Sequence, residues 1–393
     1  MYKYPLQTDN FSLWDRIKAA AFILNKSNRL TCGIQTQKLE KKWGDITKSM
    51  SVATSSGSSA NHLLVETFIQ TNKVEPQNVV VFAPSTTWSS SITPWIMRGC
   101  KVVLVDINLA DFSFDYDKLE AELKKEKYDN QTKVIWPTAL IGSVPDIQKL
   151  NDIKNQNKET FLFGDFCEST IGYYEGEHCI SYFDMATTSF FWAHEICGIE
   201  LGMLFINQEN YLNTSHSVRS HGLSRVIPCE EKKQILNNKY HYIDKEFTFV
   251  TYGTNYRPTD LNSFFCLMDT ARYDKYKKQR IKMWSYFLSK LPDSYKSLRA
   301  DMIPFCLPFI FKKGGGSPDI NKVKEKLNKE GWETRPIISF IPLNPAFNSS
   351  YKDIDVHSEF PNSSYLHKNG FYVGLNKDLT TDDVDKLIKL STE

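Results

Sequence analysis

Residues 79–106, VVVFAPSTTWSSSITPWIMRGCKVVLVD, indicate the fold of this chain most directly. Two valine-rich runs, 79–83 and 101–106, flank a connection that is long enough for a helix. Short runs of β-branched residues favour strands. Strands that are separated by a helix-length connection pair in parallel, with the helix packed against the sheet.

The same alternation extends from about residue 50 to residue 207. Further expected strands are KVIW (133–136), TFLFGD (160–165), MATTSFF (185–191) and GMLFIN (202–207). We therefore predict an α/β fold with a mostly parallel, doubly wound sheet. Ligands of such sheets bind outside the carboxyl ends of the strands.

The pattern changes beyond about residue 245. A long helical stretch (261–291) is followed by short strands and by GGGSP (314–318), which is typical of a surface loop. We predict a large α/β domain over residues 1–245, with an N-terminal arm, and a smaller C-terminal α+β domain over residues 246–393.

The composition excludes several classes of protein. The 393 residues carry a net charge of only +2, and the lysines are scattered, which argues against a nucleic-acid-binding protein. No apolar run is long enough for a signal peptide or a transmembrane helix. The eight cysteines form no CxxC pair, so we expect no zinc site, free thiols and a cytoplasmic location.

Two segments of small polar residues could contribute to a binding site. SSGSSAN (55–61) precedes a helical run, and a helix N-terminus can bind a phosphate, although such a turn can also merely cap the helix. PSTTWSSS (84–91) follows an expected strand. Trp88 could stack there on a flat heteroaromatic ring, or it could be an ordinary core residue.

Two further segments contain ionisable side chains at strand ends. Asp165 in FGDFCEST (163–170) ends an apolar strand, where its carboxylate could pair with a pyridinium N–H or cap a helix. In TTSFFWAHEICGIELG (187–202), Ser189 precedes His194 by five residues, just past a strand. His194 by itself could be either a catalytic or a structural histidine.

The order of these motifs resembles that of the fold-type I sugar aminotransferases that use pyridoxal phosphate (PLP), the DegT/DnrJ/EryC1/StrS family. The segments that carry the resemblance are SSGSSAN, TTWSS, DFCES, SFFWAH and NYRPTD (255–260). The resemblance extends over nearly the whole chain. It implies a fold-type I architecture and a homodimer.

The cofactor lysine of the family is replaced here by His194, and no lysine occurs between Lys158 and Lys232. This pattern resembles the subgroup of nucleotide-sugar 3-dehydratases, which includes the GDP-4-keto-6-deoxymannose 3-dehydratases. The resemblance implies non-covalent pyridoxamine phosphate (PMP) as the working cofactor. It also implies loss of the C3 hydroxyl from a nucleotide-linked 4-keto-6-deoxyhexose, with His194 as the base and L-glutamate restoring PMP.

The resemblance further assigns expected roles to individual residues. The residues expected to contact the cofactor are Gly57, Ser58 and Ser189 at the phosphate, Trp88 on the ring, Asp165 at the ring nitrogen, Glu168 near the ring hydroxyl, and Asn255 across a dimer interface. Weaker candidates for the nucleotide or for glutamate are Arg219, Arg225 and Arg335, any of which could instead be a surface arginine.

Some residues depart from the subgroup pattern. Glu195 stands where a second histidine is usual, and Leu201 replaces a glycine. Cys229 stands alone where iron–sulfur members have a cysteine group, so we expect no [2Fe–2S] cluster. The alternatives are an aminotransferase with a displaced lysine and a non-catalytic relative.

Overall fold

The computed structural model describes residues 2–157, 159–296, 298–312 and 319–392. The glycine-rich stretch that we expected to be a surface loop, residues 314–318, lies outside these ranges. Within them, the structure contains no helix with the length and apolar character that a bilayer crossing requires.

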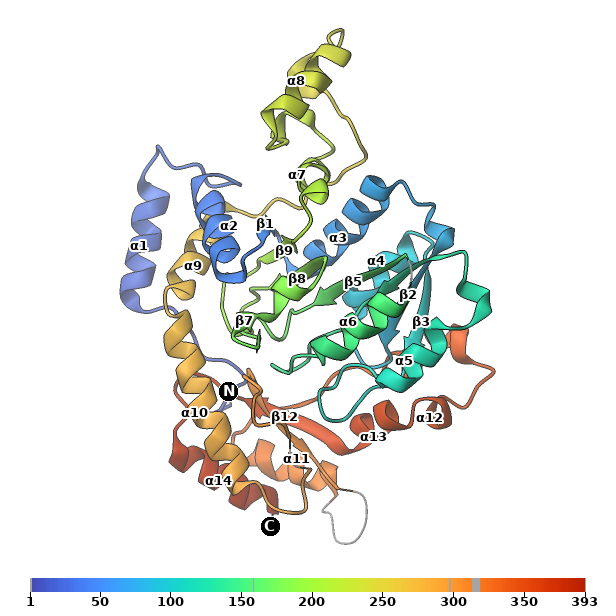
Figure 1. Ribbon diagram of the computed structural model, residues 1–393. Helices are drawn as coiled ribbons and strands as arrows, with labels where there is room; N and C mark the ends of the chain where they lie inside the picture. Colours follow the sequence, from blue (N-terminus) through green and yellow to red (C-terminus); the bar gives the residue numbers. More distant parts are fainter. Residues whose placement is uncertain (1, 158, 297, 313–318, 393) are drawn as a thin grey trace.

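A seven-stranded sheet with the order β1-β9-β8-β5-β4-β2-β3 forms the centre of the larger part of the molecule (Figure 1). Its strands are β1 (Met50–Thr54), β2 (Val79–Pro84), β3 (Lys101–Val105), β4 (Thr132–Ile135), β5 (Thr160–Asp165), β8 (Met185–Ser189) and β9 (Gly202–Ile206). β9 runs antiparallel to β8 and β1, and the remaining neighbours are parallel. The predicted mostly parallel α/β fold is confirmed, and β1 is a strand that the sequence pattern did not predict.

Helices cover both faces of this sheet. Because successive strand residues point to opposite faces, Val80 and Phe82 pack in one buried cluster while Val79 and Val81 pack in another. The first cluster includes α2 (Ile34–Thr47), α5 (Tyr116–Leu123) and α6 (Ile147–Gln156), and the second includes α3 (Gly57–Asn72), α4 (Ser89–Met97) and α7 (Leu212–Arg219). The helix-length connections therefore follow the doubly wound pattern.

The stretch predicted as one long helix forms two helices, α9 (Asp260–Thr270) and α10 (Tyr273–Lys290). α9 packs beside α1 (Leu13–Leu24), where the rings of Phe22 and Phe264 stack 4.8 Å apart. α10 instead contributes Trp284 to the core of the smaller part. The start of α10 still packs in the same cluster as α9, so α10 connects the cores of the larger and smaller parts.

The smaller part contains an antiparallel sheet with the order β10-β12-β11, and Figure 1 shows α10, α11 and α14 around it. Its remaining elements are β10 (Cys306–Ile310), α11 (Ile320–Lys329), β11 (Thr334–Pro336), α12 (Val356–Glu359), α13 (Pro361–Asn369), β12 (Gly370–Gly374) and α14 (Thr381–Thr392). This is the predicted α+β character, while the boundary at residue 245 stays a prediction.

Two other segments stand apart from these layers. A two-stranded sheet of β6 (Tyr173–Tyr174) and β7 (Glu177–His178) follows the loop after β5. The segment that contains α8 (Glu230–Lys239) projects from the body in Figure 1, and α8 has no buried residue. We refer to residues 229–252 as the α8 arm.

Candidate active site

The start of α3 lies against the end of β8. A Cβ atom on Gly57 would lie 2.7 Å from the Cβ of Ser189, so this close approach requires glycine. The Ser56 hydroxyl caps the helix by accepting a hydrogen bond from Ser59 N (3.1 Å). The first N–H groups of a helix, here those of Gly57 and Ser58, have no intrahelical partner. Together with the Ser189 hydroxyl they form a site that suits an anion.

Asp165 ends β5 and is only 2% exposed. Its carboxylate accepts hydrogen bonds from Asn61 Nδ2 (2.9 Å), from Cys167 N (3.0 Å) and from the Ser91 hydroxyl. Asn61 lies in α3 and Ser91 lies in α4, so donors from two helices hold this carboxylate. Within the described part of the chain, Asp165 caps no helix.

Trp88 is the residue that precedes α4, immediately beyond the carboxyl end of β2. Its side chain is 60% exposed, so the alternative of a buried core tryptophan is wrong. Asn61 connects the start of α4 to Asp165. Its amide nitrogen, which donates to the Asp165 carboxylate, also donates to the Ser90 carbonyl (3.2 Å). An exposed aromatic face and a buried carboxylate therefore occur at the same edge of the sheet.

Glu168 lies in the loop after β5, close to Asp165. Its Oε2 accepts a hydrogen bond from Ile141 N (3.1 Å). Burial raises the pKa of Glu168 to about 7, and the charge of Asp165 acts in the same direction. Glu168 can therefore be protonated at neutral pH and can donate a hydrogen bond.

His194 lies in the loop that follows β8, which we call the histidine loop (residues 190–201). Burial lowers the pKa of His194 to about 4, while the Ser189 backbone and the charge of Asp165 oppose this shift. Its ring lies 5.6 Å from that of Phe191 and 6.0 Å from that of Phe305, which belongs to the smaller part. Nδ1 is buried and has no partner among the described residues. The imidazole is therefore neutral at pH 7 and can accept a proton.

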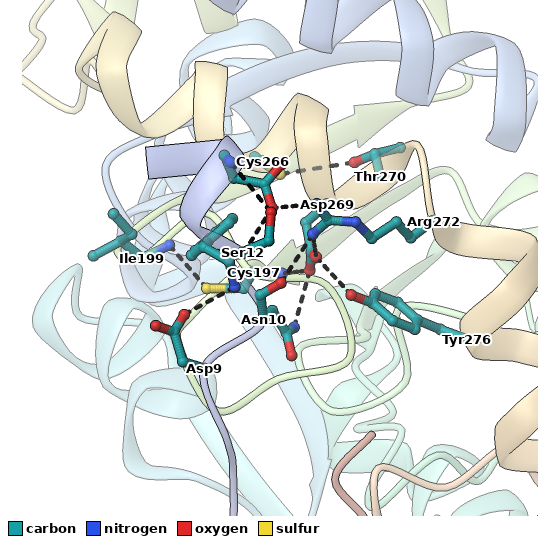
Figure 2. Close-up of polar contacts among 12 residues, drawn as sticks. Asp9, Asn10, Ser12, Cys197, Ile199, Cys266, Asp269, Thr270, Arg272 and Tyr276 are labelled. Atoms are coloured by element: carbon teal, nitrogen blue, oxygen red, sulfur yellow. Dashed lines mark hydrogen bonds and ion pairs between the residues drawn. The ribbon is translucent and has the colours of Figure 1, made fainter. Parts of the chain in front are cut away.

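The buried carboxylate of Asp269, in α9, binds the histidine loop, and Figure 2 shows its contacts. Four groups donate hydrogen bonds to it: Cys197 N (2.9 Å), Asn10 Nδ2 (3.1 Å), Tyr276 Oη (2.9 Å) and Arg272 Nη1 (3.2 Å). These donors come from the loop, the N-terminal arm and the start of α10. One side chain thereby fixes the loop to three other segments.

Asn255 lies at the surface rather than among the residues described above. Its Oδ1 accepts a hydrogen bond from Arg257 Nε (3.0 Å) of the same chain. The next residue, Tyr256, accepts a hydrogen bond from Ser55 N (2.9 Å) through its carbonyl. The NYRPTD segment therefore reaches the SSGSSAN turn, and the role of Asn255 toward a second subunit stays a prediction.

The three candidate arginines occupy different environments. Arg219 is buried, and its guanidinium donates to Glu40 Oε1 (2.5 Å) and to the Ala53 carbonyl (3.0 Å), so it is not a surface arginine. Arg225 and Arg335 are exposed and form ion pairs with Glu246 (2.7 Å) and Glu333 (2.9 Å), respectively. Arg335 lies nearest the site of the three, because it pairs in register with Tyr372, whose ring lies 5.9 Å from that of Phe305 beside His194.

Sequence reasoning missed the residues that support the site. Asn61 and Ser91 are the last residues of the SSGSSAN and PSTTWSSS motifs, and they lie near the N-termini of α3 and α4. Asp269 was detectable as an acidic residue within the apolar run FFCLMD. No sequence signal connects it to Cys197, because that contact depends on how α9 packs.

Comparisons with known proteins agree with this geometry. The chain matches the DegT/DnrJ/EryC1/StrS aminotransferase family over residues 14–390. It is 28% identical to GDP-4-keto-6-deoxy-D-mannose 3-dehydratase of Escherichia coli O55:H7 over 98% of this chain and 99% of that protein. The identity to the protein of the same name from Yersinia pseudotuberculosis is 26%, with coverages of 99% and 98%.

A solved structure also shares the fold over almost the whole chain. It is the crystal structure of a GDP-4-keto-6-deoxymannose 3-dehydratase with a trapped PLP–glutamate geminal diamine. The TM-score is 0.86 and the sequence identity is 25%, over 99% of this chain and 100% of the other.

Proposed function

The chain belongs to the DegT/DnrJ/EryC1/StrS aminotransferase family, and from this premise we propose that it is a PMP-dependent nucleotide-sugar 3-dehydratase. Its substrate is a nucleotide-linked 4-keto-6-deoxyhexose, and its product is the 4-keto-3,6-dideoxy sugar. The observation that carries this proposal is His194, a half-buried histidine whose pKa is lowered to about 4 by loss of solvation, at the position that the resemblance assigns to the family's cofactor lysine.

The residues at the sheet edge fit a phosphorylated pyridine cofactor. The start of α3 and Ser189 suit its phosphate, and the space there is too small for a side chain at residue 57. Trp88 offers an exposed ring for stacking, and Asp165 offers a carboxylate for the ring nitrogen. When bound, PMP supplies an amine for the sugar ketone and a ring that withdraws electrons.

His194 then moves the proton on which the elimination depends. Its low pKa keeps the imidazole unprotonated at neutral pH, so the ring can accept a proton. Once protonated, the same ring can donate that proton to the departing C3 hydroxyl. A lysine at this position would instead form a covalent bond with PLP.

Two partners follow from the same proposal. L-glutamate restores the amine form of the cofactor after each turnover, and a PLP–glutamate geminal diamine was trapped in the crystal structure of a relative. A second copy of the chain completes the site through Asn255, which lies on the surface next to the α8 arm. The nucleotide could be GDP, as the names of two relatives state for their own substrates.

The main alternative is an aminotransferase with a displaced lysine. Among the described residues, the one charged group that shifts the pKa of His194 is Asp165, and no lysine contributes. A non-catalytic relative would have no need for Asp165, Ser189 and an exposed Trp88 in one place. These observations favour the dehydratase.

The test is a reaction with defined components. Purified protein is incubated with PMP, glutamate and a panel of nucleotide-linked 4-keto-6-deoxyhexoses. We expect ammonia and a 3-deoxy product, and we expect dialysis to remove the cofactor. A 4-amino sugar would identify an aminotransferase, and cofactor that stays attached after denaturation would contradict the proposal.

A further inference from the structure

Glu195, the residue after His194, connects the two loops of the candidate site. Its side chain is 1% exposed, and its Oε2 accepts a hydrogen bond from Ile171 N (3.0 Å). Ile171 lies in the loop after β5, which begins directly after Asp165 and carries Glu168. The carboxyl group therefore joins the histidine loop to the loop that carries Glu168.

Glu195 also lines a small hollow that opens to solvent and has room for about one water molecule. Arg280 of α10 lines the same hollow, and its side chain is also buried. Asn10, Gln279 and Lys377 complete a polar lining from the N-terminal arm, α10 and the segment after β12. A carboxyl group and a guanidinium thus face one polar space.

These two groups do not touch. Glu195 Oε1 has no hydrogen-bond partner in the described part of the chain, and Arg280 donates from Nη1 to the Pro304 carbonyl (3.0 Å). Their charges nevertheless act on each other, because Arg280 opposes the effect of burial, which raises the pKa of Glu195 to about 7. Buried polar atoms of this kind are costly unless they are hydrogen-bonded.

We propose that ordered water in this hollow bridges Glu195 Oε1 to Arg280, and that Glu195 is thereby a positioning residue for His194. A polar hollow with several possible hydrogen-bond partners is the setting in which buried water is stable. The bridge fixes the peptide between residues 194 and 195 to α10, and it complements the tether from Asp269 to Cys197. The role in turnover rests on the proposed function of His194 as the base.

The experiment compares Glu195→Met and Arg280→Met, which keep the bulk but remove the polar ends, with the conservative changes Glu195→Gln and Arg280→Lys. The matched control is Glu200→Met, an exposed position on the same loop. Full-length protein with isotope-labelled histidines gives an NMR signal for His194. This signal is assigned by its absence from the spectrum of His194→Asn. Near-ultraviolet circular dichroism checks that each variant is folded.

We expect both methionine variants to shift the His194 signal and to lower kcat by up to about a hundred-fold with little change in KM. The double variant should be no worse than the more affected single variant, and the conservative changes should restore most of the signal. A crystal structure should show water within hydrogen-bond distance of both groups. Glu200→Met should match the parent.

The proposal is overturned if the His194 signal is the same in both folded methionine variants, if the two effects add, or if the hollow is dry. The NMR comparison uses neither cofactor nor substrate. Absence of a 3-deoxy product would therefore contradict the proposed function and leave the positioning result standing. An unchanged His194 signal would contradict the positioning role of Glu195 and leave the proposed function standing.

Discussion

The sheet edge and the α8 arm use polar and apolar side chains in opposite ways. At the sheet edge, buried polar groups such as Asp165 are held by donors from the same chain. In the arm, large apolar side chains face solvent, with Tyr252 90% exposed and Tyr242 and Phe247 also exposed. The first region is organised within one chain, whereas the second exposes apolar surface that a partner would bury. If the second copy proposed above packs on this surface, the arm forms part of the dimer interface.

The largest effect is expected for Asp165→Asn. An amide keeps the size of the side chain, but it cannot hold a pyridinium proton as an ion pair, so the ring loses its electron-withdrawing power. We expect turnover to be abolished while circular dichroism and the unfolding midpoint show an intact fold. Near-normal turnover would show that Asp165 serves only to hold α3 and α4 together.

His194→Asn should lose the base and reduce turnover by about 10²- to 10⁴-fold. His194→Lys should reduce dehydration as well, and it should attach PLP covalently, giving a visible absorbance band that borohydride bleaches. Some transfer of an amino group to C4 could accompany this change. If His194→Asn dehydrates at the parental rate, His194 is not the base and the mechanism is wrong.

Asp269→Ala tests the tether of the histidine loop. It leaves the buried Cys197 N–H and the guanidinium of Arg272 without their shared acceptor. We expect the free energy of unfolding in urea to fall by about 3 kcal/mol. The control is Asp274→Ala, an exposed aspartate at the start of α10, which should change stability far less. Equal effects would contradict the tether.

The pH dependence provides a separate test of the same imidazole. The base must be neutral, so activity is lost as the pH falls through the pKa of His194, which burial lowers to about 4. An exposed histidine would show this loss near pH 6.5. We therefore expect kcat/KM to be insensitive to this group between pH 5 and 8. The contribution of His194 to stability should decline as the pH falls from about 6.5 to 4, because the unfolded chain binds that proton first, whereas the raised pKa of Glu195 acts in the opposite direction.

The smallest effect on the protomer is expected in the α8 arm. Tyr242→Ser combined with Phe247→Ser removes exposed apolar surface, so the stability of the protomer should change little. Sedimentation at a fixed concentration should nevertheless show a shift from dimer toward monomer. Lys239→Ser, also exposed in the arm, should leave assembly unchanged. An unaffected dimer in the double variant would place the interface elsewhere.

Local sequence patterns were sufficient to predict much of the fold of this molecule. The parallel strands follow from short β-branched runs with helix-length connections, and their carboxyl ends mark the site. The positions of Asp165 and His194 at strand ends could be predicted for the same reason. The break between α9 and α10 could not, because 261–291 has helical character throughout and no residue in it marks a helix end.

The sequence by itself determined the fold class, the family and the replacement of the expected lysine by His194, because these depend on the order of residues along the chain. Only the tertiary structure decided that Trp88 is exposed, that Arg219 is buried against Glu40, and that Asp269 binds Cys197 N. The last two contacts join residues that are 179 and 72 positions apart. Their formation depends on how helices pack, and burial, which sets the pKa of His194, is a property of that packing.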